Sequence, residues 1–243
     1  MMDAYQSLSG FYDSLTTDIP YEAFADYYES VFQQHPGEFR MLLDLCCGTG
    51  TLTRILALRG YEMIAADASE EMLMQAREKC ADLPLPPLFL CQEAAELDLY
   101  GTVDAAVCSL DGMNYLSPEE LPEVFHRLHL FIRPGGLFIF DIRSPESFAA
   151  LDGGIWVDET EEVFCLWRSE FDPEERIMYY DMDLFSPEGD LWKREQEEHI
   201  EYAHDPEFLK QELRKAGFSE PVFTDQAPQG DQGRRFVISI REE

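Results

Sequence analysis

Two glycines stand two residues apart in the segment 44-DLCCGTG-50, which directly follows a run of apolar residues. Because glycine lacks a Cβ, the backbone of such a turn can approach a bound molecule closely, and Asp44 adds a carboxylate at its start. A dinucleotide-binding turn would carry a third glycine where this chain has Thr53, and it would not set an acid beside two phosphates. The turn therefore favours a ligand that carries positive charge and no phosphate.

Acidic side chains also follow the next three apolar runs of the chain. Asp67 ends the second run, where a carboxylate can accept both hydroxyls of a ribose. After the third run, Glu93 offers a side-chain acceptor to the amino group of an adenine, and the segment Glu93-Ala94 offers the base a backbone N–H donor. Asp111 follows the fourth run. Together these positions predict a nucleoside that carries a cationic group.

The apolar runs predict the strands that must bring these residues together. Strands are expected at residues 41–46, 63–67, 88–91, 103–109 and 137–142. Helical patterns lie between them: Gly60 is placed to end the first helix, and Ser69 to cap the second. Pro122 is expected to kink the next helix or delay its start after a capping box at 117–120, and residues 133–136 are predicted to form a turn. Such alternation predicts a doubly wound parallel α/β sheet, which binds ligands at the carboxyl ends of its strands.

The pattern changes after about residue 155 to that of antiparallel strands. Met178 and Tyr180 alternate with Tyr179 and Asp181, as in a sheet with one exposed face. Such strands are predicted at 163–171, 177–185 and 191–202. A helix capped by Asp205 and two more strands then complete the α/β unit. The expected organisation is a helical cover at 1–38, an α/β domain at 39–154 and 204–243, and an inserted antiparallel lid over the acceptor at 155–203.

In combination, these motifs resemble those of the class I S-adenosylmethionine-dependent methyltransferases. The resemblance spans about residues 39–142 and the closing helix and strands, and it rests on 42-LLDLCCGTG-50, 66-ADAS-69, 92-QEA-94 and 134-PGG-136. It implies a mostly parallel, seven-stranded Rossmann-like sheet and methyl transfer from S-adenosylmethionine, with S-adenosylhomocysteine as the product. The family has glycine where this chain has Cys46, so an ordinary φ is expected there. The cofactor contacts expected from the resemblance and from the neighbouring apolar and aromatic residues are Tyr12, Tyr21, Asp44, Cys46, Gly48, Thr49, Gly50, Asp67, Ala68, Met72, Gln92, Glu93, Ala94 and Leu110.

The amino-terminal segment is similar to that of small-molecule methyltransferases of the glycine N-methyltransferase type. A sulfonium is already an activated methyl donor, so the protein needs mainly to align the acceptor and exclude water. If the acceptor is an amine or a hydroxyl, one proton must leave, and Tyr12, Asn114 and Tyr115 are the catalytic candidates. Aromatic packing explains Tyr12 and Tyr21 equally well. His199, among acidic neighbours, is expected to be a charged surface residue and a weaker candidate.

The net charge of −31 limits the partners of the chain. Nucleic acids and anionic membranes bind clustered Lys and Arg, so both are disfavoured, and with them an RNA-modifying methyltransferase. A non-catalytic cofactor-binding module stays open as an alternative, whereas Asp44 and Thr53 disfavour an oxidoreductase. The six cysteines show no zinc-site spacing, and neither a secretory signal nor a membrane span is expected, which favours a cytoplasmic protein with no metal. The sequence identifies neither the small-molecule acceptor nor the oligomeric state.

Overall fold

The computed structural model describes residues 5–225, 228 and 233–243. Its larger sheet contains β1 (Met41–Leu45), β2 (Glu62–Asp67), β3 (Leu88–Cys91), β4 (Val103–Cys108), β5 (Ile132–Arg143), β10 (Val222–Thr224) and β11 (Arg234–Ile240). Its smaller sheet contains β6 (Ile155–Glu159), β7 (Phe164–Asp172), β8 (Ile177–Glu188) and β9 (Leu191–Tyr202). The helices are η1 (Leu8–Gly10), α1 (Tyr12–Leu15), α2 (Tyr21–Gln34), α3 (Thr51–Leu58), α4 (Glu70–Lys79), η2 (Ala94–Glu96), η3 (Gly112–Tyr115), α5 (Leu121–Phe131), α6 (Pro145–Leu151) and α7 (Pro206–Lys215).

The larger sheet has the strand order β10-β11-β5-β4-β1-β2-β3. Its five amino-terminal strands pair in parallel, and β11 runs antiparallel to both β5 and β10. The predicted doubly wound, mostly parallel α/β fold is therefore confirmed. Because the parallel strands end at one edge, the residues that follow β1, β2, β3 and β4 are brought to the same side of the molecule.

Two apolar layers cover the larger sheet. Alternate residues of a strand point to opposite faces, so Leu43 of β1 packs in a cluster with residues of α5 and α7, and its neighbour Leu42 packs in a cluster with residues of α2 and α3. Residues such as Phe125 and Tyr28 are fully buried in these layers. This packing fixes the strands whose ends carry the predicted site.

Two local features near β5 are instructive. Helix α5 begins only at Leu121, so Pro122 stands in its first turn; before it, Glu120 accepts the backbone N–H of Ser117 at 2.8 Å. The start of helix α5 is therefore delayed, which is one of the two outcomes expected for Pro122. The turn predicted at 133–136 lies inside β5 as an irregular stretch: Ile132 pairs with Val103 of β4, and pairing with β4 resumes only where Leu137 faces Ala105. Although Gly135 has φ +75°, its N–H donates to the carbonyl of Arg241 at 2.9 Å, and this contact keeps the segment within the sheet.

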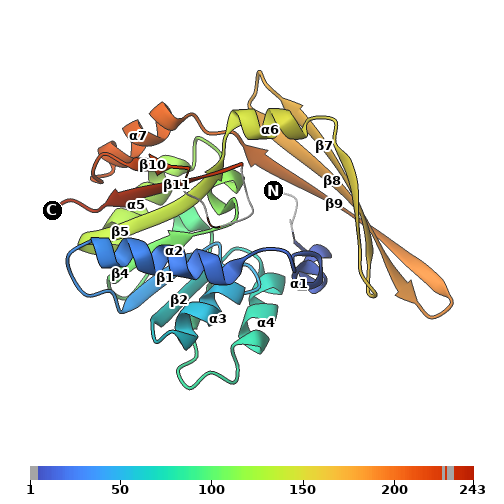
Figure 1. The fold of residues 1–243 in the computed structure, drawn as a ribbon, viewed down its shortest axis with the longest axis horizontal. Helices are drawn as coiled ribbons and strands as arrows, with labels where there is room; N and C mark the ends of the chain where they lie inside the picture. Colours follow the sequence, from blue (N-terminus) through green and yellow to red (C-terminus); the bar gives the residue numbers. More distant parts are fainter. Residues whose placement is uncertain (1–4, 226–227, 229–232) are drawn as a thin grey trace.

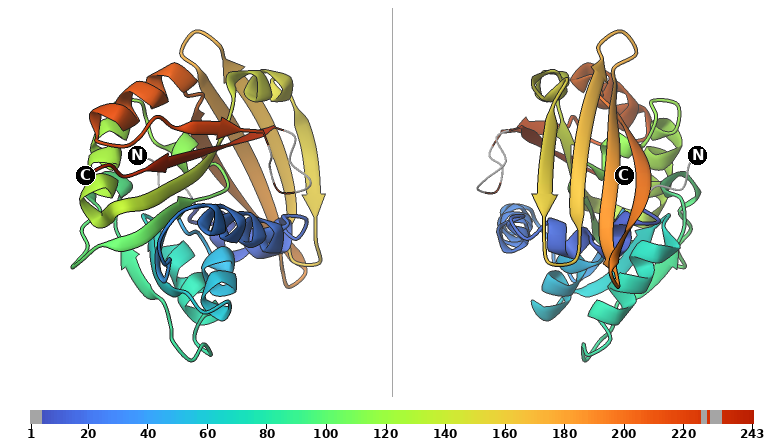
Figure 2. Two further views of the ribbon diagram at one scale, coloured as in Figure 1. Left: turned by 60° about the vertical axis from the view of Figure 1, so that its left-hand side comes forward. Right: turned by 90° about the vertical axis from the view of Figure 1, so that its right-hand side faces the viewer.

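The smaller sheet, of strand order β6-β7-β8-β9, covers one side of the larger domain (Figure 2). Met178 and Tyr180 are buried while Tyr179 and Asp181 are exposed, as the alternation predicts. Asp183 departs from the alternation because Arg168 and Arg194 pair with its buried carboxylate, at 2.7 and 2.6 Å. Helix α1 lies between the two parts (Figure 1): residues of the amino-terminal segment pack on β7 and β8 through an apolar cluster.

Within the described residues, no group of histidine, cysteine and acidic side chains could hold a metal ion. The six cysteines are free thiols. No described helix is both long and apolar enough to cross a membrane.

Candidate active site

The glycine-containing turn after β1 is a series of left-handed residues. Cys46 has φ +57°, Gly48 +54° and Gly50 +71°. The expectation of an ordinary φ at Cys46 is wrong: Cys46 adopts a left-handed conformation of the kind that glycine takes most readily, and Cys47 N–H closes the turn by donating to the carbonyl of Ala66 at 3.1 Å. A Cβ at Gly48 would meet no atom within 4 Å, whereas one at Gly50 would lie 2.8 Å from the Cβ of Ala76. Gly48 therefore presents bare backbone to open space, and Gly50 permits close packing on α4.

Asp67 stands at the end of β2 and is bound to this turn. Its Oδ2 accepts the N–H of Gly48 at 2.8 Å and its Oδ1 accepts the N–H of Ser69 at 2.9 Å. Burial raises the pKa of Asp67, and the backbone donors oppose that rise. Each carboxylate oxygen keeps a lone pair for a further donor. These residues fit a nucleoside such as S-adenosylmethionine, since the oriented carboxylate adjoins Gly48, where the backbone of the turn is open to a ligand.

Asp44 is buried within β1 and is hydrogen-bonded to the residue that replaces the third glycine. Thr53 Oγ1 donates to Asp44 Oδ2 at 2.5 Å. Burial raises the pKa of Asp44 to about 7; the Thr53 bond opposes the shift and the charge of Asp67 adds to it. A buried carboxyl that titrates near neutrality gains stability as an anion when a cation is placed beside it.

The other predicted cofactor residues lie around the same edge. Gln92 bonds through its side chain to the backbone of Asp98, at 3.1 and 3.4 Å, and so shapes the loop after β3. Glu93 is exposed, while Ala94 is buried at the start of η2. The remaining positions lie at the start of the next helix and beyond β4: Ala68, then Met72, which is buried on α4, and Leu110, which has φ +58°.

Asp13 attaches the amino-terminal cover to the turn after β1. Its carboxylate accepts from Thr49 Oγ1 at 2.7 Å and pairs with Lys79 Nζ at 2.7 Å. Burial raises the pKa of Tyr21 to about 12 and that of Tyr12 well above its ordinary value, so both hydroxyls stay neutral. Asp13 was not predicted as a site residue, although it directly follows the candidate Tyr12.

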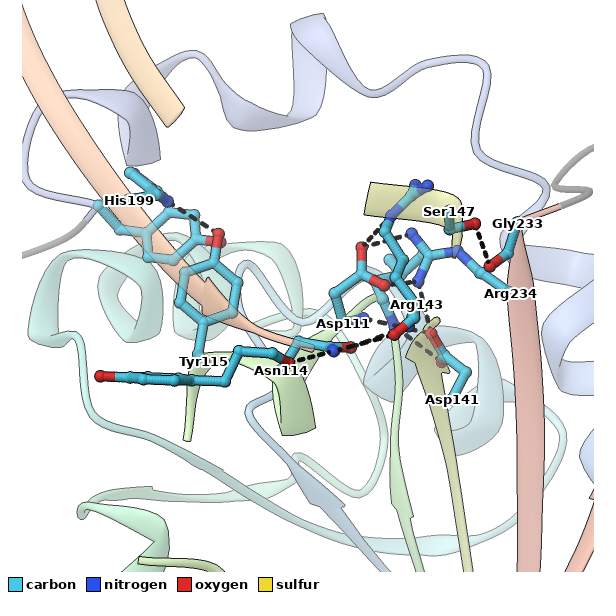
Figure 3. Close-up of polar contacts among 12 residues, drawn as sticks. Asp111, Asn114, Tyr115, Asp141, Arg143, Ser147, His199, Gly233 and Arg234 are labelled. Carbon is cyan, nitrogen blue, oxygen red and sulfur yellow. Dashed lines mark hydrogen bonds and ion pairs between the residues drawn. The ribbon is translucent and has the colours of Figure 1, made fainter. Parts of the chain in front are cut away.

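The loop after β4 is held by a buried ion cluster that sequence reasoning missed (Figure 3). Leu110 and Asp111 both have positive φ, and the two oxygens of Asp141 accept their N–H groups at 2.9 and 3.2 Å. Arg234 binds Asp111 at 2.6 Å and Asp141 at 2.5 Å, and Arg143 binds Asp111 at 3.1 Å. Asp111 therefore stabilises the loop from within an ion cluster; it is not an isolated acid at a strand end.

Asn114 connects the two sheets. Its amide nitrogen donates to the carbonyls of Tyr202 and Arg143, at 2.8 and 3.3 Å, and its oxygen accepts the N–H of Arg143 at 3.0 Å. The side chain is fully buried. Because these bonds use both N–H groups and the oxygen, a catalytic role for Asn114 stays a prediction, whereas its role in setting the neighbouring Tyr115 is visible in the geometry.

His199 is 3% exposed, so the expectation of a surface histidine is wrong. Its Nδ1 lies 2.8 Å from the hydroxyl of Tyr115, and its Nε2 lies 2.9 Å from Glu197 Oε1. The hydroxyl of Tyr5 donates to that of Tyr115 at 2.7 Å, which extends the chain by a residue that the sequence did not single out. Four side chains from three parts of the sequence thus form a continuous hydrogen-bonded chain.

The expectation that His199 is exposed was wrong because β9 buries its polar face. Glu197, His199 and Glu201 face inward, while Glu198 and Ile200 are exposed. A surface strand normally exposes its polar residues and buries its apolar ones. The inverted pattern indicates that the inner face of β9 lines a polar region between the two sheets.

Comparison with known proteins settles the family. A family model described as a methyltransferase domain matches residues 42–136. A protein of Bacillus subtilis whose name assigns it to the methyltransferases is 30% identical over 239 residues, which cover 96% of this chain and 95% of that protein. The chain is a class I S-adenosylmethionine-dependent methyltransferase. S-adenosylmethionine is therefore its cofactor.

The methyltransferase also shares its whole architecture with solved structures. An S-adenosylmethionine-dependent methyltransferase from Clostridium acetobutylicum superposes with a TM-score of 0.84 at 27% identity, covering 98% of this chain and 99% of that chain. A sugar N-methyltransferase from Streptoalloteichus gives a TM-score of 0.84 at 21% identity, over 100% of this chain and 96% of that chain. The inserted sheet is therefore part of a shared fold.

Proposed function

We propose that this methyltransferase transfers a methyl group to a nitrogen or oxygen nucleophile of a small molecule by in-line displacement beneath the inserted sheet. The observation that carries the proposal is the buried chain of hydrogen bonds from Tyr5 and Tyr115 through His199 to Glu197. A nucleophile of either kind loses a proton on methylation, and this chain is a route by which that proton can leave.

The cofactor supplies a methyl group that its sulfonium already activates, so this chain must bind, orient and exclude water. In the proposal, Asp67 binds the ribose hydroxyls, and Glu93 and Ala94 bind the adenine. The turn from Cys46 to Gly50 and the buried carboxyl of Asp44 hold the methionine half.

The charge states of the residues in this chain determine which group holds the proton after transfer. Burial raises the pKa of Tyr5 and of Tyr115 well above the ordinary value, so both are neutral hydroxyls and cannot act as anionic bases. Burial also opposes ionisation of Glu197, but hydrogen bonds from His199 and from the N–H groups of Leu8 and Tyr5 hold its pKa below the ordinary value. An ionised Glu197 stabilises an imidazolium at His199.

Each hydroxyl in the chain therefore accepts one proton as it donates another. A tyrosine hydroxyl accepts it from the nucleophile and passes its own proton along the chain to Nδ1 of His199. The Nε2–H of the resulting imidazolium stays bonded to Glu197. Asn114 is a positioning residue in this scheme, because it holds η3, which carries Tyr115, against β5 and β9.

A small acceptor is favoured by the surface charge and by the inserted sheet. At a net charge of −31, a polyanionic acceptor would be repelled. The inserted sheet, residues 155–203, acts in the proposal as a lid that excludes water from the methyl group. The structurally similar sugar N-methyltransferase acts, by its name, on a sugar nitrogen, which makes amino sugars a reasonable first group of acceptors to test.

The experiment measures methyl transfer from isotopically labelled S-adenosylmethionine to a panel of amino sugars, amines and alcohols. His199→Gln and Tyr115→Phe are compared with His126→Gln and Tyr100→Phe, whose side chains are exposed. Removing a positioned acid–base group lowers rates by about 10²–10⁴-fold, so kcat should fall in the first pair and stay unchanged in the second.

Cofactor affinity is the control for these variants. Cofactor affinity should be the same in all four variants, since none of these side chains touches the turn after β1. Unchanged kcat in His199→Gln would remove the proton route. Labelled methyl in no product, with cofactor binding intact, would instead favour a non-catalytic cofactor-binding module.

A further inference from the structure

Glu201 extends the buried polar face of β9 by one position beyond His199. Its side chain is 95% buried, since only 5% of its surface is exposed. Within the described part of the chain its Oε2 atom has no hydrogen-bond partner. Burying a carboxyl oxygen without a partner is costly, so such an atom calls for a specific explanation.

The charged residues of the ion cluster after β4 act electrostatically on Glu201. Among the described residues, Asp111 and Asp141 are balanced there by Arg143 and Arg234. An ionised Glu201 would leave this group with one surplus negative charge. Burial raises the pKa of Glu201 well above its ordinary value. The charge of Asp111 adds to this rise, Arg143 and Arg234 oppose it, and Asp141 adds to it more weakly.

The tyrosine–histidine chain reaches the same buried face of β9, two residues before Glu201, through His199. A charge on Glu201 raises the pKa of Tyr5 and of Tyr115, and it also acts on Tyr180 of β8. Glu201 is therefore close both to the proposed proton route and to the ion cluster. The charged and titratable groups around it are Tyr5, Asp111, Tyr115, Asp141, Arg143, Tyr180, Glu197, His199 and Arg234.

We propose that Glu201 is the acceptor-binding residue and that the acceptor is an amine, whose N–H groups bind the unpartnered Oε2 atom. This inference rests on the proposed methyl transfer and specifies its substrate class. A protonated amine supplies both features that the site lacks: a hydrogen-bond donor for Oε2 and a positive charge that balances an ionised Glu201.

The chemistry balances with an amine. An alkylammonium ion that enters beside the neutral acid form of Glu201 displaces one proton to solvent and leaves a paired ammonium and carboxylate. A second proton passes from the ammonium to the tyrosine–histidine chain, which frees the nitrogen lone pair. The C–N bond then forms as the S–C bond breaks, and positive charge moves from sulfur to the methylated nitrogen. Glu201 stabilises that charge, which a neutral ether product would not carry.

The test uses pairs of probes that differ only in the nitrogen: glucosamine against glucose, and 2-aminoethanol against ethane-1,2-diol. Dissociation constants are measured for the full-length protein loaded with S-adenosylhomocysteine. A hydrogen bond to a charged group corresponds to a preference of roughly 10-fold or more. Wild type should prefer at least one amine by that factor, Glu201→Gln should lose the preference, and Glu198→Gln on the exposed face of β9 should keep it. No preference in any wild-type pair, or a preference retained by Glu201→Gln, would overturn the proposal.

A second measurement needs no variant. Calorimetry of the preferred amine is performed near pH 7 in two buffers that differ in ionisation enthalpy, and the difference gives the number of protons released. The proposal expects close to one proton per amine bound, and absence of proton release contradicts it. Binding selectivity and methylated product are separate readouts. Selective amine binding without methylation would overturn the proposed function alone. Methylation of alcohols at a rate that Glu201→Gln does not change would overturn this inference alone.

Discussion

The carboxylate of Asp141 in β5 holds the backbone of Asp111, which has φ +68°, by accepting its N–H at 3.2 Å. The same carboxylate also accepts from Leu110 and pairs with Arg234, so one side chain stabilises two consecutive left-handed residues and a buried cation. The loop that carries Asn114 and Tyr115 therefore depends on a strand residue that touches neither of them.

Asp141→Asn should destabilise the protein by about 1–3 kcal/mol, because Arg234 loses one of its two carboxylate partners and keeps Asp111. The control is Asp104→Asn, since Asp104 also binds two backbone N–H groups and an arginine, Arg133, but is only partly buried. Urea unfolding monitored by circular dichroism should show a loss several times smaller for Asp104→Asn. Equal losses would mean that burial of the cluster is not what makes it important.

Cys46 tolerates a left-handed conformation that favours glycine. Cys46→Gly should leave the free energy of unfolding within about 1 kcal/mol of wild type, because relief of the strain offsets the greater freedom of glycine in the unfolded chain. Cys46→Val should cost about 1–2 kcal/mol more, since β-branched residues are least suited to positive φ. The free energy of unfolding of both variants is measured with a denaturant. A valine variant as stable as the glycine variant would contradict the left-handed conformation at Cys46.

Asp44 makes stability depend on pH in a defined direction. Its folded pKa of about 7 lies above the unfolded value, so its contribution is fully present below about pH 4 and is lost as pH rises towards 7. Within that window one such group changes the free energy of unfolding by up to about 1.4 kcal/mol per pH unit. Asp44→Asn should remove this slope. The difference in unfolding free energy between wild type and variant is measured at pH 5 and pH 8, and a difference that does not change with pH would rule out the raised pKa.

Asp67→Ala should weaken binding of S-adenosylmethionine by about 1.5–3 kcal/mol, the range for hydrogen bonds to a charged group. Part of the loss comes through the turn, because Asp67 also holds the N–H of Gly48. Glu78→Ala is the control, since Glu78 is an exposed acid on the neighbouring helix α4. Calorimetry that finds the same affinity for Asp67→Ala and wild type would exclude Asp67 from the cofactor site.

The fold and the strand-end residues were predictable because apolar periodicity and turn chemistry are local signals. Ser69 caps α4, as predicted, by accepting the N–H of Met72 at 3.1 Å. The positive φ of Cys46 was not predictable from its residue type, because cysteine rarely adopts it and the bond that closes the turn, from Cys47 N–H to Ala66, depends on the neighbouring strand β2.

The partners of the predicted residues were harder to foresee. Asp141 and Arg234 lie in strands far apart in the sequence, and their pairing exists only once β5 and β11 are neighbours. His199 was misplaced because binary patterning assigns alternating polar residues to solvent, whereas the inner face of β9 buries them. Tyr5 gave no sequence signal, since its role depends on where the amino-terminal segment packs.

Methyl transfer to the preferred amine, followed as labelled methyl on nitrogen in wild type and in His199→Gln, tests the proton route and the acceptor class together. We expect N-methylated product in wild type and a kcat lower by about 10²–10⁴-fold in His199→Gln. An equal kcat in the two proteins, or a methyl group that never appears on nitrogen, would show that the route through His199 or the amine acceptor is wrong.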